Sequence, residues 1–208
     1  MANLAAAFGG RPVRYVSNAP YNGAANLYYS TGASALYVGD PVVVNGSSNQ
    51  AAYYGSPAGS LPSVVLATAG IAGTGTPLTG FVVGFFGEDS ASKSYGVNGA
   101  ARGVLVADDP SLVFEIMDDG VTALDYTAVQ GTGILNLSTY SGSTATGYSG
   151  ATLSTTSFPL NTATSSYFGL DQLKVLRLAT RSNNAVGANA VWDCMIVRHT
   201  NSNIALGY

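Results

Sequence analysis

The chain is poor in charge: Asp, Glu, Lys and Arg together make up 9% of its 208 residues, against about 25% in ordinary soluble domains. A free monomer normally owes its solubility to many mixed surface charges. Two explanations stay open. Either much of the surface is buried in an assembly, or Ser, Thr, Asn and Gly solvate it.

The chain also has a single cysteine and a single histidine. Cys194 has no partner for an intrachain disulfide, and the strand-like run around it, residues 191–197, favours a buried structural thiol. His199 alone excludes a multi-histidine metal site. No Gly-x-Ser-x-Gly elbow accompanies it, which disfavours a Ser-His-Asp hydrolase.

Features of membrane and nucleic-acid partners are missing as well. No apolar run approaches the roughly 18 residues that span a bilayer. The first residues have neither a basic region nor the long apolar region of a secretory signal, so we expect the protein to stay in the compartment where it is made. Few basic residues and a sequence pI near 4.8 oppose binding to a phosphate backbone.

Short β-favouring runs are what the chain does contain, punctuated by 26 glycines and 8 prolines. Almost nothing shows helical period, and no repeat of fixed period is visible. The pattern predicts one all-β domain over residues 1–208, a β-sandwich or barrel, jelly-roll-like, with Gly/Ser/Thr-rich loops. The expected strands are 13–16, 27–29, 35–44, 64–66, 80–86, 104–107, 112–117, 133–137, 151–158, 173–179 and 191–198.

The most informative segment is residues 102–117, which reads as two apolar strands joined by an Asp-Asp-Pro turn. Asp108 and Asp109 have side chains that bond to nearby backbone amides, and Pro110 cannot extend a strand ladder. The segment is one of five short strings whose order along the chain resembles that of a known protein family. The others are residues 8–13 (FGGRPV), 37–43 (YVGDPVV), 80–85 (GFVVGF) and 186–192 (VGANAVW).

Together these five strings resemble tailed-bacteriophage capsid cement (decoration) proteins. The resemblance covers most of the chain except the Ser/Thr-rich region of residues 136–166. It implies a non-enzymatic structural protein of the virion, made in the host cytoplasm and bound to the outer surface of the capsid. The implied partners are the major capsid protein and further copies of the chain, with a trimer favoured over a dimer because icosahedral shells offer many local three-fold positions.

Charge is distributed unevenly along the chain. Residues 1–87 carry a net charge of +1, residues 88–125 a net of −6 and residues 126–208 a net of +2. Basic ends around an acidic centre suit docking to an acidic surface. We expect residues 1–20 to form an extended docking arm outside the core, with a capsid or subunit interface made of apolar anchors and long cations. Its residues are Phe8, Arg11, Pro12, Arg14 and Tyr15.

The acidic centre has other interpretations. Convergent carboxylates serve glycosidases and calcium sites, and the pairs Asp108/Asp109 and Asp118/Asp119 are candidates. Adjacent strand residues point to opposite faces, however, and Asp-Asp-Pro and Asp-Asp-Gly are ordinary turn sequences. We therefore expect the acids of residues 88–125 to face solvent or a neighbouring subunit, with no catalytic residue, no metal and no cofactor.

Thirteen tyrosines among Ser, Gly and Asn leave one alternative function. Tyrosines such as Tyr28, Tyr29, Tyr53 and Tyr54 suit wet recognition surfaces and stack on sugars. The alternative to a cement protein is therefore a carbohydrate-binding adhesin module on the virion surface.

Overall fold

The computed structural model describes residues 3–67, 78–86, 94–130, 132–133, 135–136, 142–156 and 172–197. Apart from one 3₁₀ turn, η1 (Tyr126–Ala128), its regular elements are strands. They are β1 (Arg11–Tyr15), β2 (Asn26–Ser30), β3 (Pro41–Ser48), β4 (Pro62–Leu66), β5 (Gly80–Phe86), β6 (Arg102–Ala107), β7 (Leu112–Met117), β8 (Thr132–Gly133), β9 (Leu135–Asn136), β10 (Thr152–Leu153), β11 (Leu173–Leu178) and β12 (Val191–Ile196).

Five strands close into a barrel in the order β2-β4-β3-β5-β6. All neighbouring pairs are antiparallel except β2 and β4, which are parallel. β-branched side chains pack well on a pleated surface, and valines dominate the interior. The buried cluster inside the barrel is Leu36, Val42, Val64, Val82, Val104 and Val106.

The other large sheet has the order β1-β7-β12-β11-β8, and its described pairings are antiparallel. Strand β7 is buried along its whole length. One face of the sheet carries Phe114, Ile116, Trp192 and Cys194 into the main core. At the sheet edge, Ala19–Tyr21 fold back along β1, with a bridge between Arg14 and Pro20. That return covers part of an edge that would otherwise attract another strand.

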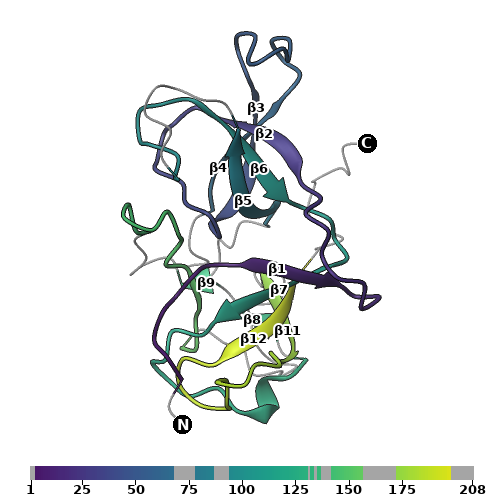
Figure 1. Cartoon of the computed structure of the whole chain (residues 1–208), viewed down its shortest axis with the longest axis vertical. Coiled ribbons are helices and arrows are strands. Elements are labelled where there is room, and N and C mark those ends of the chain that lie inside the picture. The colour runs from purple at the N-terminus through teal and green to yellow at the C-terminus, as the bar shows by residue number, and fades with distance from the viewer. Residues whose placement is uncertain are drawn as a thin grey trace.

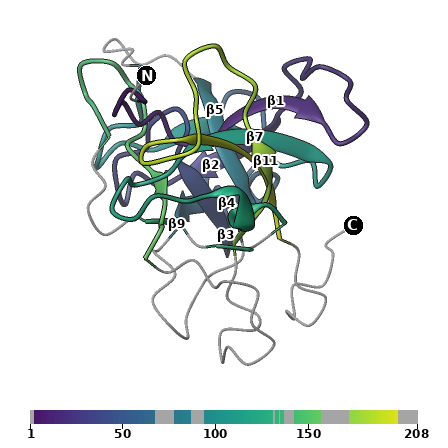
Figure 2. The same ribbon diagram turned by 90° about the horizontal axis from the view of Figure 1, so that it is seen from below.

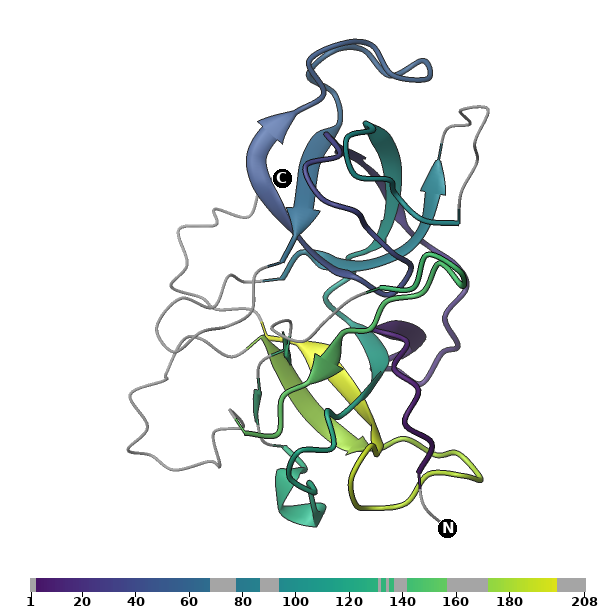
Figure 3. The ribbon, with the colours of Figure 1, turned by 90° about the vertical axis from the view of Figure 1, so that its left-hand side faces the viewer.

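The barrel and the sheet lie one above the other along the long axis of the molecule (Figure 1). Viewed along that axis, the sheet lies across the end of the barrel (Figure 2). Their cores are continuous: Phe81 of β5 and Phe114 of β7 have ring centroids 4.8 Å apart, and both belong to the main cluster. The loop between β3 and β4 projects from the opposite end of the barrel (Figure 3).

The Asp-Asp-Pro turn carries the chain from the barrel to the sheet. Strand β6 pairs with β2 and β5, whereas β7 pairs with β1 and β12, so the two strands do not form a hairpin. Asp108 accepts hydrogen bonds from the Asn26 amide and the Tyr28 hydroxyl. Asp109 accepts from the amide and hydroxyl of Ser111.

The all-β barrel prediction is confirmed, and the strands at 80–86 and 112–117 match residue for residue. The strand expected at 35–44 begins at Pro41 instead. Asp40 is buried just before it, where its carboxylate accepts the Tyr37 amide. Residues 134, 137, 157–158 and 198 of the expected strands, and His199, lie outside the described residues.

The N-terminal arm is extended, as predicted, but Arg11–Tyr15 is part of the sheet. Strand β1 pairs with β7 along its length, with a bulge between Pro12 and Arg14. The expectation that residues 1–20 stand outside the core is therefore wrong for this strand. Deleting residues 1–16 would remove this edge strand, so we expect such a truncation to disturb the sheet.

The expectation that the central acids face solvent or a neighbouring subunit is wrong for Glu115 and Asp118, which are both buried within the chain itself. Asp118 accepts four N–H hydrogen bonds, from the backbones of Gly120, Asn189 and Ala190 and from the Trp192 indole. Burial raises the pKa of its carboxyl, and the four donors oppose that shift. The acid thus ties the turn after β7 to the start of β12.

We predict that Trp192→Ala lowers the free energy of unfolding by about 3 to 5 kcal/mol. The side chain is fully buried beside Cys194, so its removal leaves a cavity in the main core. Urea unfolding measures the change.

In the native wild type, Cys194 should react with a water-soluble thiol reagent only as fast as the protein unfolds. Immediate reaction would contradict the burial of Cys194.

We also predict that Asp118→Asn destabilises the fold by roughly 3 kcal/mol, because the new amide group turns a donor toward buried N–H groups. The matched control is Asp109→Asn in the exposed turn, where asparagine supports the same local bonds and the change stays within about 0.5 kcal/mol. Equal stability of the two variants by urea unfolding would refute the structural role of Asp118.

Candidate functional site: the arginine face of the sheet

A row of charged residues crosses four strands of the sheet. Arg11 on β1 lies opposite Glu115 on β7, Glu115 opposite Asp193 on β12, and Asp193 beside Arg177 on β11. Like charges directly opposite each other on neighbouring strands are destabilising. The two central acids therefore need cations, and the row supplies one on each side.

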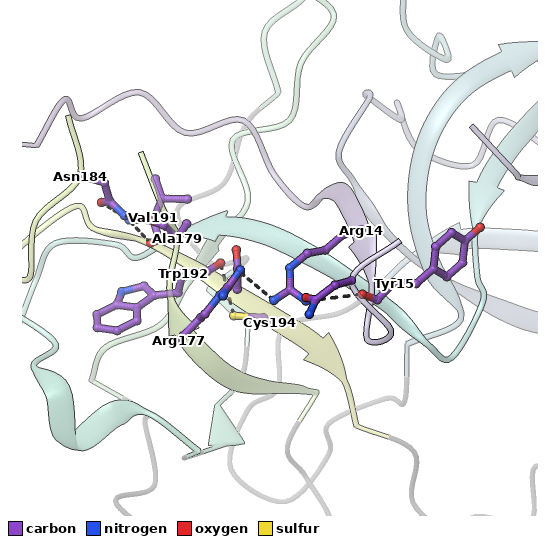
Figure 4. A network of polar contacts seen from close by, with 10 residues as sticks. Arg14, Tyr15, Arg177, Ala179, Asn184, Val191, Trp192 and Cys194 are labelled. Carbon is purple, nitrogen blue, oxygen red and sulfur yellow. Dashed lines mark hydrogen bonds and ion pairs between the residues drawn. The ribbon is translucent and has the colours of Figure 1, made fainter. Parts of the chain in front are cut away.

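Two further arginines complete the cluster. Arg14 donates to an Asp193 oxygen at 3.0 Å, and Arg177 donates to the same oxygen at 2.8 Å; Figure 4 shows both guanidinium groups converging from β1 and β11. Because Arg14 lies on β1, its side chain crosses β7 to reach β12. Arg181, just after β11, pairs with Glu115. We call these four arginines with Glu115 and Asp193 the arginine face.

The arginine face carries a net charge of +2 on a chain whose formal net charge is −3. Its cations are not equally accessible. The side chains of Arg11 and Arg177 are 58% and 52% exposed, whereas Arg14 and Arg181 are largely buried. Each acid thus has one inner arginine that completes the fold and one outer arginine that solvent reaches.

Electrostatics hold Glu115 ionised. Burial would raise the pKa of this carboxyl, but the hydrogen bonds from Arg181 and Arg11, together with their charges, outweigh burial and lower it. Asp193 is compensated in the same way, by Arg14 and Arg177.

Phe8 extends the arginine face with an aromatic ring. The guanidinium groups of Arg11 and Arg181 lie over this ring, 5.5 and 5.1 Å from its centroid, which is cation–π geometry. Phe8 also packs against the apolar cluster of Met117, Ala179 and Val191. Beside it is a hollow of about 100 Å³ whose lining includes Asn3, Phe8, Met117 and Arg181.

Asn3 fixes the segment that leads to Phe8. Its amide donates to the carbonyls of Ala185 and Ala188, and its side-chain oxygen accepts the Ala185 amide. Gly10 donates its N–H to the Gly39 carbonyl of the barrel at 2.9 Å. The arm is therefore held in place before β1 begins.

The five predicted interface residues do not all share this surface. Phe8, Arg11 and Arg14 are brought together by the arginine face. Tyr15 packs against the main core, and its hydroxyl donates to the Asn22 side chain. Pro12 lies opposite the core residue Phe114 in the β1–β7 register. Tyr15 is thus a structural residue rather than a free anchor.

Sequence reasoning missed Glu115, Asp193, Arg177 and Arg181 as members of one cluster. A signal was present, because Glu115 and Asp193 each interrupt a strand whose other residues are mostly apolar and buried. A buried acid requires a cation or several hydrogen-bond donors. The partners are up to 179 positions away in the chain, so only the register of the sheet identifies them.

Comparisons with family models, with curated proteins and with solved structures found no match. Within the described residues, no group of three or more His, Cys, Asp or Glu side chains is placed to hold a metal ion. The described part of the chain contains no helix long and apolar enough to cross a membrane.

The lowered pKa of Glu115 predicts how stability depends on pH. Its contribution is fully present above the unfolded-state pKa near 4.5 and is lost as pH falls through the lower folded-state value. The difference in unfolding free energy between wild type and Glu115→Gln, measured with urea, should therefore be largest at neutral pH and shrink as the pH falls below 4.5. A difference that stays constant over this range would contradict the ion pairing of Glu115.

Proposed function

We propose that this chain is a non-enzymatic virion protein that binds the outer surface of an assembled phage capsid and stabilises it. Its partners are the major capsid protein and further copies of itself, with a trimer favoured over a dimer. The resemblance of five sequence strings to capsid cement proteins supports this proposal. One structural observation carries it: an acidic chain presents a net-positive arginine face on a rigid sheet.

The geometry of that face suits docking to an acidic partner. Arg11 and Arg177 are half-exposed and lie on strands β1 and β11, on either side of the two acids. Arginine forms bidentate hydrogen bonds with carboxylates, and it is enriched at binding hot spots. Because the inner arginines remain paired with the acids, the outer ones can bind a partner without leaving a buried charge unpaired.

The mechanism is thermodynamic. A protein that binds the assembled shell but not its dissociated subunits stabilises the shell by mass action. A trimer that contacts several capsid subunits gains from effective concentration, since the later contacts form within one complex. Such a function needs no reacting group.

Light scattering of the purified protein should give about three times the chain mass of 21.1 kDa.

The docking test uses undecorated expanded capsids and the single variants Arg11→Gln and Arg177→Gln. Each removes one outer cation, while Glu115 keeps Arg181 and Asp193 keeps Arg14. We expect both variants to fold and to bind capsids about tenfold more weakly than wild type at low salt. The wild-type advantage should shrink as NaCl screens the attraction.

The matched control is Arg102→Gln, which removes the same charge from the barrel. Arg102 is the first residue of the barrel strand β6, where it lies over the Phe85 ring and donates to the Tyr95 carbonyl. Sedimentation of capsids with bound protein gives the affinities. Wild-type binding by both sheet variants would refute the arginine face as the docking site, and failure of the wild type to bind would refute the cement function.

A further inference from the structure

Four aromatic rings gather at the end of the barrel that is farthest from the sheet. Tyr29 of β2 contacts Tyr53 with ring centroids 5.5 Å apart, Tyr53 contacts Tyr54 at 4.9 Å, and Tyr54 contacts Phe86 of β5 at 5.8 Å. All three contacts are edge-to-face. Tyr53 and Tyr54 belong to the loop that projects beyond the barrel between β3 and β4 (Figure 3).

The inner ring of this group is fixed in place. The Tyr53 hydroxyl accepts the Gly103 amide at 2.8 Å and donates to the Phe86 carbonyl at 3.1 Å, which joins the loop to β6 and β5. A Cβ atom at Gly103 would lie 3.1 Å from the Tyr53 ring, so glycine there leaves room for it. Asn49 braces the loop base through bonds to Ala51, Pro57 and Leu61.

The outer rings are exposed. Tyr54 is 59% exposed and Phe86 is 44% exposed, and their planes meet at 75°. Together they form an aromatic corner on a rigid support. Rings of this kind keep their contact area available at little cost in conformational entropy.

The backbone at Tyr54 is unfavourable for the residue it carries. Tyr53 and Ser56 exchange two backbone hydrogen bonds of 2.9 Å, and both central residues have positive φ, 43° at Tyr54 and 85° at Gly55. This two-residue turn favours Asn-Gly, and an aromatic residue in the left-handed region is uncommon. Local strain of this kind is typical of functional positions.

Charge and area limit what binds the corner. Residues 41–87, which include Tyr53, Tyr54 and Phe86, contain no charged residue. Arg102 of β6 is a charged neighbour of Tyr53, and its guanidinium lies over the Phe85 ring and donates to the Tyr95 carbonyl. The two exposed rings offer on the order of 200 Å², whereas a stable protein interface takes about 800 Å² from each partner. A pyranose ring has an uncharged, flat C–H face of about the size of one aromatic ring, and it packs on such a ring by dispersion.

We propose that Tyr54 and Phe86, supported by Tyr53, form a binding site for a neutral hexose oligosaccharide. A sugar ring stacks on the exposed face of Tyr54, and Phe86 flanks it. The site lies at the opposite end of the molecule from the arginine face, so both surfaces are available at once. The inference does not rest on capsid docking.

The test uses the variant Tyr54→Asn in the full chain. Asparagine is the residue that this turn prefers, so the variant should melt at or above the wild-type temperature while it loses the stacking ring. Maltohexaose, cellohexaose and mannohexaose serve as probes in separate NMR titrations. We expect at least one of them to bind the wild type with a dissociation constant near or below about 1 mM, and Tyr54→Asn to weaken that binding about tenfold or more.

The control is Tyr126→Asn, which removes another exposed tyrosine, from the turn η1, and should bind the same sugar as the wild type does. Three results overturn the proposal. None of the probes binds the wild type, or Tyr54→Asn binds the sugar with wild-type affinity, or Tyr54→Asn lowers the oligomeric mass, which would assign the corner to contacts between copies of the chain.

Discussion

Two carboxylates on neighbouring strands, Glu115 and Asp193, impose the constraint on which the sheet depends. They lie directly opposite each other near the centre of the sheet and are almost fully buried. Uncompensated, this pair would repel and would pay the cost of desolvation. The compensating arginines come from both ends of the chain. The same interactions therefore fix β1 and β11 beside the central strands and create a positive surface.

The fold separates two kinds of surface along its long axis. The sheet and the barrel lie at opposite ends of this axis (Figure 1). The sheet carries the arginine face, and the far end of the barrel carries the aromatic rings of Tyr54 and Phe86. A continuous core, marked by the contact of Phe81 with Phe114, joins them. The shared core thus holds the two surfaces at opposite ends of one packed unit.

Most strands could be predicted from local pattern, because the alternation of apolar residues and the presence of turn residues are properties of a few neighbouring positions. The environment of each charged side chain could not be predicted in this way. Glu115 and Asp118 are close in sequence to exposed turn acids. In the folded chain, however, Glu115 pairs with two arginines, and Asp118 accepts hydrogen bonds from four N–H donors. The same limit applies to Arg11, which looked like part of a free arm and instead extends the sheet.

The tyrosines show the limit in another way. Composition indicated a recognition surface, but alternation alone gave no means of separating core rings from exposed ones. Tyr15 packs against the main core, whereas Tyr54 is held at a loop tip by a two-residue turn. The distinction depends on hydrogen bonds between segments distant in sequence, such as those of the Tyr53 hydroxyl.

We propose that the sheet end of the molecule contacts the capsid. Hydrogen–deuterium exchange of the protein, free and bound to undecorated capsids, would locate that contact. Binding should slow exchange in peptides that cover Arg11–Tyr15 and Leu173–Leu178, and leave the loop of residues 49–61 unchanged. Protection confined to that loop, with β1 and β11 exchanging as in the free protein, would contradict the claim.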